Sequence, residues 1–165
     1  MKLHELMLQR GETDVWLTPP AIVEALGPFD LCPAAAVGSP FRYAAEHYTV
    51  EDDGLVLEWA GRVWLNPPYE RGLIAKFTRR MVDHDHGTML VFPRTETRWF
   101  QLAARHCSAM LLRTPRIAFC RLDGIPASGK FLGSVFFAFG RYDAGKLMRA
   151  HEESDLFKGV LFSRT

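Results

Sequence analysis

One short stretch near the middle of the chain constrains the fold more than any other. The β-prone residues 62–65 (Arg-Val-Trp-Leu) are followed directly by Asn66-Pro67-Pro68-Tyr69. Because proline cannot donate a hydrogen bond to a sheet, this sequence predicts a short strand that ends before a rigid loop. The loop is either a proline turn that only terminates the strand, or a functional loop that presents Asn66 and Tyr69 at the strand's end.

The order of residues 66–69 suits chemistry on an amino group attached to an aromatic ring, such as that of adenine. The lone pair of such an amine is delocalised into the ring, and two hydrogen-bond acceptors on its two protons would localise it. The Asn66 side-chain oxygen and the Pro67 carbonyl can be these acceptors, because the two prolines fix the backbone around them. Tyr69 offers a ring for stacking, typically worth ~1–3 kcal/mol per base. A base in duplex DNA would have to be flipped out to reach it.

Apolar spacing and turn residues outline the remaining elements. A helix is predicted to begin at residues 18–20, with Thr18 as the N-cap and two prolines in the first turn, and to stop at Gly27. Further helices are predicted around residues 73–81 and 99–103, and strands at 29–32, 88–92, 109–112, 116–120 and 133–139. Strands that first alternate with helices and later cluster predict an α/β fold with an antiparallel strand pair near the C-terminus.

Charge is unevenly distributed along the chain, although the net charge is only +1. Residues 1–66 contain 4 Lys/Arg and 10 Asp/Glu, whereas residues 67–165 contain 16 and 9. The chain has 15 Arg and 5 Lys, and Arg is the side chain best suited to bidentate contacts with phosphates and base edges. The alternative explanation for this bias is the composition of a GC-rich genome.

The stretch between residues 94 and 121 concentrates this basic character. It holds six arginines and a single acid, Glu96, with Trp99 and Phe100 among them. The arginines are Arg94, Arg98, Arg105, Arg113, Arg116 and Arg121. This pattern favours a surface that binds a nucleic-acid backbone, and we expect about half of these arginines to take part.

The size and the cysteines argue for one ordinary domain. With 165 residues, 48% hydrophobic and 24% charged, the chain can bury a core without disulfides or metals. Cys32, Cys107 and Cys120 lack metal-type or disulfide spacing, so they are predicted to be reduced core thiols. No metal site is predicted, because His84-Asp85-His86 has no further clustered ligand. No apolar run reaches the ~20 residues of a membrane span, so no membrane partner is expected.

The sequence resembles a known family of enzymes. Residues 66–69 are similar to the Asn-Pro-Pro-Tyr motif of amino-group methyltransferases that use S-adenosylmethionine, and the wider pattern resembles the phage and prophage DNA N-6-adenine methyltransferases (the Dam family). The resemblance is carried by residues 16–19, 29–35, 52–55, 64–69, 97–100 and 116–119, with Trp59 and Pro93. It implies a single methyltransferase domain over residues 1–165 with a reduced, Rossmann-like sheet, which methylates adenine in double-stranded DNA by base flipping.

The same resemblance implies a cofactor site. Its expected residues are Trp16, Thr18, Pro19, Asp30, Pro33, Ala34 and Asp53. The family usually carries an acid where this chain has Cys32. Asp30 lies two residues earlier, on the same face of the strand. Either Asp30 replaces the acid, or the cofactor site is damaged. Asp53 is expected to contact the ribose or the adenine of S-adenosylmethionine, unless it is only a solvated turn acid.

The expected reaction and DNA sites lie further along the chain. Asn66, Pro67, Pro68 and Tyr69 are expected at the reacting amine, and Arg94, Arg98 and Arg116 at the DNA. Phe119 is expected to close the second face of the flipped base, unless it is an ordinary core residue. The loops 94–98 and 121–131 are the only expected base-reading elements. Because two short loops place few base contacts, we predict a short adenine-containing recognition site of about two to four base pairs, unless a dimer doubles the contact surface.

Two other functions remain open from the sequence. Methylation of a glutamine amide in a protein would use the same Asn-Pro-Pro-Tyr acceptors, although the basic second half argues against it. A catalytically silent DNA- or protein-binding module that keeps the fold is supported by Cys32 at the position of the acid. We expect a cytoplasmic location, in the bacterial host if a phage encodes the protein, and leave a homodimer open.

Overall fold

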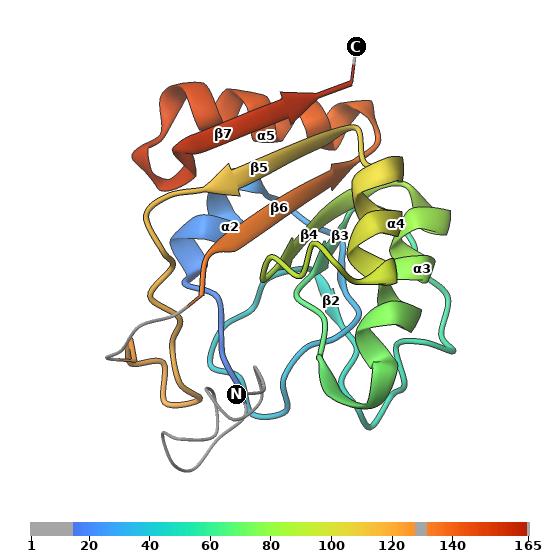
Figure 1. The fold of residues 1–165 in the computed structure, drawn as a ribbon. Coiled ribbons are helices and arrows are strands. Elements are labelled where there is room, and N and C mark those ends of the chain that lie inside the picture. Colours follow the sequence, from blue (N-terminus) through green and yellow to red (C-terminus); the bar gives the residue numbers. More distant parts are fainter. Residues whose placement is uncertain (1–14, 128–131, 165) are drawn as a thin grey trace.

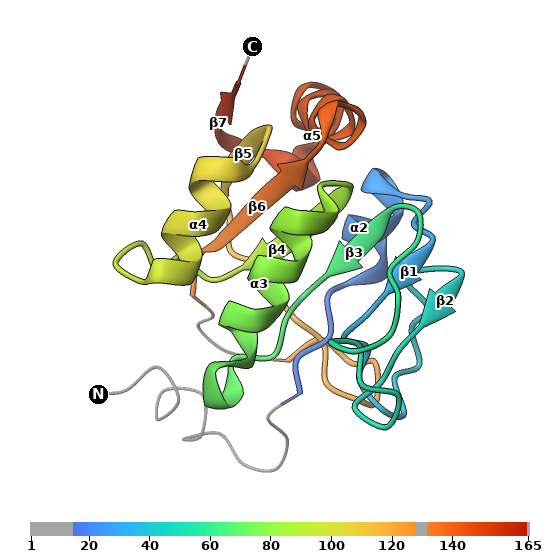
Figure 2. The same ribbon diagram turned by 90° about the vertical axis from the view of Figure 1, so that its right-hand side faces the viewer.

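The computed structural model describes residues 15–127 and 132–164, which form a seven-stranded sheet with helices on both faces (Figures 1 and 2). The strands are β1 (Leu31–Cys32), β2 (Glu46–His47), β3 (Val63–Leu65), β4 (Gly87–Val91), β5 (Ala109–Arg113), β6 (Ser134–Phe139) and β7 (Gly159–Ser163). The described helices are α2 (Pro20–Leu26), α3 (Leu73–His84), α4 (Arg98–His106) and α5 (Arg141–Glu153), with the 3-10 helices η1 (Glu70–Gly72) and η2 (Asp155–Phe157). The chain is therefore a mixed α/β protein, as the sequence predicts.

The first half of the sheet is parallel. Its strands follow the order β2-β1-β3-β4, and β1, β3 and β4 are buried along their whole lengths. Such strands are covered on both faces, which explains their continuous apolar sequences. The strands predicted in this half at 29–32, 62–65 and 88–92 are confirmed to within two residues.

The second half of the sheet is antiparallel. Strand β6 lies between β4 and β5 and is antiparallel to both, and β7 pairs antiparallel with β5 at the sheet edge. This part is therefore larger than the predicted strand pair. The strand predicted at 116–120 is wrong. The segment largely alternates buried and exposed residues, as a strand does, but it pairs with no strand of the sheet. Cys120 makes only isolated bridges, to Leu17 and Pro126.

The helices divide into two layers (Figure 2). Helices α3 and α4 cover one face of the sheet, and α3 buries the predicted apolar stripe at Ile74, Phe77 and Met81. Helices α2 and α5 cover the other face. Helix α5 is not predicted from the sequence, because its mostly polar residues include only a thin buried stripe around Leu147.

Helix α2 begins differently from the prediction. Pro20 is its first residue and Pro19 its N-cap, with no side-chain capping hydrogen bond, so Thr18 is not the cap. Gly27 ends the helix as predicted, and its N–H donates to the carbonyls of Val23 and Glu24. The side chain of Thr18 is left available for a different partner.

A buried ion pair holds the amino end of β3. Arg62 donates through Nε and Nη2 to Oδ1 of Asp143 in α5, at 3.1 and 2.6 Å, and Asp143 is fully buried. The same guanidinium donates to the carbonyls of Leu26 and Pro28, and it lies over the Phe29 ring. These contacts tie α2, β3 and α5 together at the edge of the sheet where β3 begins.

The cysteines confirm the sequence-based prediction. Cys32, Cys107 and Cys120 are all buried and free. Among the helices in the described parts of the chain, none is both long and apolar enough to cross a bilayer.

Candidate active site

Three parallel strands bring the predicted site loops to one edge of the sheet. The register pairs Leu31 with Val63, and Val63 with Gly87, so β1, β3 and β4 run side by side in one direction. The loops that follow them, residues 33–36, 66–69 and 92–97, therefore emerge at the same carboxyl edge. In open α/β sheets this edge is where ligands bind.

Asn66 leaves the end of β3 half-buried, with its amide fixed on one side. Its Nδ2 donates to Oγ1 of Thr18 at 3.4 Å. Thr18 is itself 1% exposed, and its carbonyl accepts a 2.6 Å hydrogen bond from the Tyr43 hydroxyl. The Oδ1 of Asn66 accepts no hydrogen bond from residues 15–127 or 132–164. The amide thus keeps an acceptor available for a ligand.

The segment containing Thr18 is held in place by a second segment far away in sequence. The backbone N–H groups of Leu17 and Cys120 each donate to the other residue's carbonyl, both at 2.8 Å. This pairing lays residues 16–19 beside residues 119–120. The predicted cofactor segment and the predicted DNA segment therefore meet next to Asn66.

An aromatic cluster surrounds Tyr69. Its ring stacks on Phe92 at 5.5 Å between centroids and meets Trp99 edge-on at 6.3 Å. Phe119 is 2% exposed and packs edge-on against Phe92 at 5.7 Å. Within the described structure, Phe119 therefore supports the ring of Phe92, and its own ring is not exposed for a base to stack on.

The Tyr69 hydroxyl has a structural partner that the sequence does not reveal. It accepts a 2.7 Å hydrogen bond from the backbone N–H of Phe92, at the end of β4. Burial raises the pKa of Tyr69 above its usual value, so the hydroxyl remains protonated at neutral pH. This bond joins the loop of residues 66–69 to the loop that leads to Arg94 and α4.

The loop after β1 is covered by the turn that carries Asp53. A Cβ atom at Gly54 would lie 1.9 Å from the Pro33 carbonyl, so only glycine allows this close approach. Asp53 has a left-handed φ of 58° and accepts a hydrogen bond from the Leu55 N–H through Oδ1. Asp53 is exposed and directly precedes this contact, and Ala34 of the loop after β1 is half-buried.

Neither Cys32, at the position of the family's acid, nor Asp30, its possible replacement, offers a free carboxylate to this arrangement. Burial raises the pKa of Cys32 to about 12, so its thiol is neutral and supplies no negative charge. Asp30 precedes β1, and its Oδ2 accepts a 2.7 Å hydrogen bond from the N–H of Arg62, the residue before β3. At about 3.3 Å per residue, this is some 13 Å along the strand from Asn66, so the structure does not bring Asp30 and Asn66 together.

The basic segment divides evenly between paired and unpaired arginines. Arg94 pairs with Glu96 and Arg121 with Asp123, while Arg113 donates to the carbonyls of Leu156 and Pro115. The side chains of Arg98, Arg105 and Arg116 are exposed and have no hydrogen-bond or ion-pair partner in the described ranges. Arg98 begins α4 at the carboxyl edge, whereas Arg105 lies in its last turn. The C-terminal part of the expected reading loop, residues 128–131, lies outside the described residues.

Two residues of the site are missed by sequence reasoning. Tyr43 supports Thr18 through its hydroxyl, and Phe92 forms the centre of the aromatic cluster. Tyr43 lies in a stretch without periodicity and carries no local signal. Phe92 is predicted only as the end of a buried strand before Pro93.

Fold and site together define a class: an α/β protein with polar and aromatic loops gathered at the carboxyl edge of a sheet whose last strands are antiparallel. The sequence model of the family described as DNA N-6-adenine-methyltransferase (Dam) matches residues 6–150. The chain belongs to this family.

One curated relative is similar over most of its length. The DNA N-6-adenine-methyltransferase of Escherichia phage T1 is 25% identical over an alignment 163 residues long. The match covers 84% of this chain and 67% of the phage protein. No solved structure matches the chain.

Proposed function

We propose that this protein transfers the methyl group of S-adenosylmethionine to the exocyclic amine of adenine in DNA, with the target base flipped out of the duplex. The observation that carries the proposal is the Asn66 amide at the end of β3, anchored through Nδ2 and with Oδ1 free of any described partner. Family membership and the name of the phage relative support DNA adenine as the substrate.

The chain's own residues act on the amine. Asn66 Oδ1 and the Pro67 carbonyl accept hydrogen bonds from the two N–H groups of the amine, which localises the nitrogen lone pair for attack. The hydrogen bond to Thr18 fixes which amide atom faces the amine, because the amide nitrogen is already engaged. Such preorganised groups lower the barrier because they need not reorient during the reaction.

The residues around the loop after β1 fit S-adenosylmethionine. Exposed Asp53 would supply a carboxylate for ribose hydroxyls, and the loop of residues 33–36 emerges at the same carboxyl edge of the sheet as Asn66. When bound, the cofactor supplies a methyl group on a positively charged sulfur. This assignment needs the methyl carbon and the amine within about 3–3.5 Å, so both must border Asn66. The sheet would then be a reduced Rossmann-like methyltransferase sheet.

The aromatic cluster and the free arginines suit the DNA. The stacking of Tyr69 on Phe92 supports a role for the Tyr69 ring in stacking on the flipped adenine. Exposed Arg98 and Arg116 are available to neutralise phosphates around the gap that the flipped base leaves.

The test is a methyl-transfer assay with labelled cofactor. The full chain is incubated with several adenine-containing duplexes, and the DNA is digested to nucleosides. We expect label in N6-methyladenine with the natural chain and none with Asn66→Ala. Label in a protein glutamine instead of DNA would contradict the proposal.

One observation favours a second candidate, a silent DNA-binding module. The buried, neutral Cys32 stands at the position of the family's acid, and the Asp30 carboxylate is engaged elsewhere. Calorimetry separates the two functions: the enzyme binds S-adenosylmethionine, whereas the silent module binds DNA but shows no heat with millimolar cofactor.

A further inference from the structure

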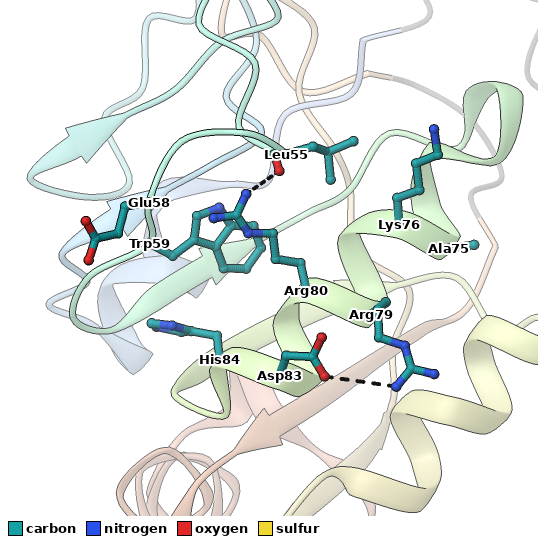
Figure 3. A pocket seen from close by; sticks show the side chains of 9 residues that line it. All are labelled: Leu55, Glu58, Trp59, Ala75, Lys76, Arg79, Arg80, Asp83 and His84. Carbon is teal, nitrogen blue, oxygen red and sulfur yellow. Dashed lines mark hydrogen bonds and ion pairs between the residues drawn. The ribbon is translucent and has the colours of Figure 1, made fainter.

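An open groove of about 790 Å³ runs along the outer side of α3, away from the aromatic cluster. Its walls are the segment from Leu55 to Trp59 and the exposed face of α3 (Figure 3). Arg80 reaches across this groove toward Leu55, whereas its neighbour Arg79 points away and pairs with Asp83 (Figure 3). Two adjacent arginines of one helix thus have different surroundings.

Arg80 binds backbone carbonyls of a single loop. Its Nη1 donates to the carbonyls of Leu55 and, at 3.3 Å, Gly54, and its Nη2 donates to that of Leu57. No carboxylate of the described residues pairs with it. A planar guanidinium can serve several carbonyls at once, which a lysine ammonium on a flexible stem cannot do with the same geometry.

Trp59 packs against the guanidinium of Arg80, and we call these two side chains the clamp. The Arg80 guanidinium lies 5.0 Å from the centroid of the Trp59 ring, which in turn stacks on Phe77 of α3. The indole Nε1 of Trp59 donates a 2.7 Å hydrogen bond to the Gly54 carbonyl. Gly54 therefore accepts hydrogen bonds from both members of this cation–π pair.

The loop that the clamp holds, residues 53–57, is also the loop that contacts the proposed cofactor site. Gly54 lies directly against the Pro33 carbonyl, so close that a Cβ atom would not fit. Asp53 precedes it in a left-handed conformation that non-glycine residues rarely adopt without support. Turn hydrogen bonds within residues 49–57 shape this loop, and the bonds from the clamp join it to α3.

We propose that Arg80 is a positioning residue for S-adenosylmethionine, which holds residues 53–57 over the loop after β1 and thereby sets cofactor affinity. The inference rests on the proposed function. It assigns Arg80 no contact with the substrate or the reacting atoms. Its effect should therefore fall on cofactor binding and not on the rate at saturation.

The test compares Arg80→Lys with the matched control Arg79→Lys, each in the full chain. Without cofactor, amide hydrogen exchange over residues 53–57 should become faster in Arg80→Lys and stay unchanged in the control. Calorimetry should give a dissociation constant for S-adenosylmethionine raised about tenfold in Arg80→Lys, which corresponds to about 1.4 kcal/mol. The kcat at saturating cofactor and the KM for DNA should change less than twofold.

The outcomes separate this inference from the proposed function. Unchanged cofactor affinity in Arg80→Lys overturns the positioning role, even if exchange becomes faster. A natural chain that binds the cofactor with this dependence on Arg80 but does not methylate adenine overturns the proposed reaction and leaves the positioning role intact. Trp59→Phe, which keeps a smaller aromatic ring and loses the Nε1 donor, should weaken cofactor binding in the same direction by a smaller factor. No weakening in this variant contradicts the role of Trp59 in holding the loop.

Discussion

The two ends of β3 are held in opposite ways. At the amino end, Arg62 donates five hydrogen bonds, four from its side chain and one from its backbone N–H, and reaches a fully buried carboxylate. At the carboxyl end, Asn66 makes a single side-chain hydrogen bond of 3.4 Å. A polar group whose partners are complete can only stabilise the fold, whereas one with an unused acceptor can bind a substrate.

The same contrast extends to the loops at each end. The amino end is tied to α2 and α5 through Leu26, Pro28 and Asp143. At the carboxyl end, the loops contact each other through few bonds, such as Tyr69 to Phe92 and Asn66 to Thr18. We therefore expect substitutions at the amino end to change stability and those at the carboxyl end to change catalysis.

The largest expected effect is on stability, at the amino end. Arg62→Leu should lower the free energy of unfolding by about 3–5 kcal/mol, because it leaves the buried Asp143 carboxylate without its ion-pair partner. His86 Nδ1 lies 3.1 Å from the other oxygen of Asp143. Urea titration measures the change. Arg105→Leu, at an exposed position, is the control and should stay within about 0.5 kcal/mol.

The next effect is on catalysis, at the carboxyl end. Asn66→Ala should reduce kcat by ~100- to 1000-fold, because an acceptor aimed at the amine in the transition state is lost. Cofactor affinity measured by calorimetry and the unfolding midpoint should both remain nearly unchanged. Near-normal turnover in this variant would refute the mechanism.

Tyr69→Phe tests a bond between two site loops. From the sequence alone this change would do little, since the stacking ring remains. The structure revises that expectation, because the Phe92 N–H loses its acceptor, at a cost of about 1–3 kcal/mol of stability. Tyr142→Phe, at a tyrosine 58% exposed, is the control and should unfold at the natural midpoint. Equal unfolding midpoints for the two variants would mean that the hydrogen bond from the Phe92 N–H to the Tyr69 hydroxyl does not stabilise the fold.

Thr18→Val should have a smaller effect, restricted to catalysis. It keeps the shape of the side chain and removes the acceptor that orients the Asn66 amide. Loss of one such hydrogen bond, about 1 kcal/mol, predicts roughly a fivefold lower kcat. Thr18→Ser keeps the hydroxyl and should restore the rate. If serine and valine variants react equally slowly, Thr18 acts through packing and not through Asn66.

The smallest effect concerns DNA affinity. Arg98→Ala should flatten the log–log dependence of DNA affinity on salt by about one unit, as expected for the loss of one phosphate contact. Arg105 lies seven residues further along α4, about 10 Å from Arg98 and toward the opposite edge of the sheet, so Arg105→Ala should leave the slope unchanged. Equal slopes for both variants and the natural chain would exclude a DNA contact at Arg98.

Local sequence determined the elements that rest on strong, short-range signals. The apolar run before Asn66 and its prolines predicts β3 and its end, because proline cannot continue the ladder. The spacing of Ile74, Phe77 and Met81 predicts α3 for the same kind of local reason. The resemblance of the wider sequence pattern to the Dam family is likewise confirmed, because the family model matches residues 6–150.

Only the tertiary structure decided which polar groups are used up and which remain available. Asp30 and Asn66 are both polar residues beside short strands, yet one accepts from the Arg62 backbone and the other keeps a free acceptor. Thr18 carries the sequence signal of a helix cap but serves Asn66 instead, because the pairing of Leu17 with Cys120 carries it there. These partners lie tens of residues apart in sequence, and no local propensity encodes a contact that exists only once the sheet has formed.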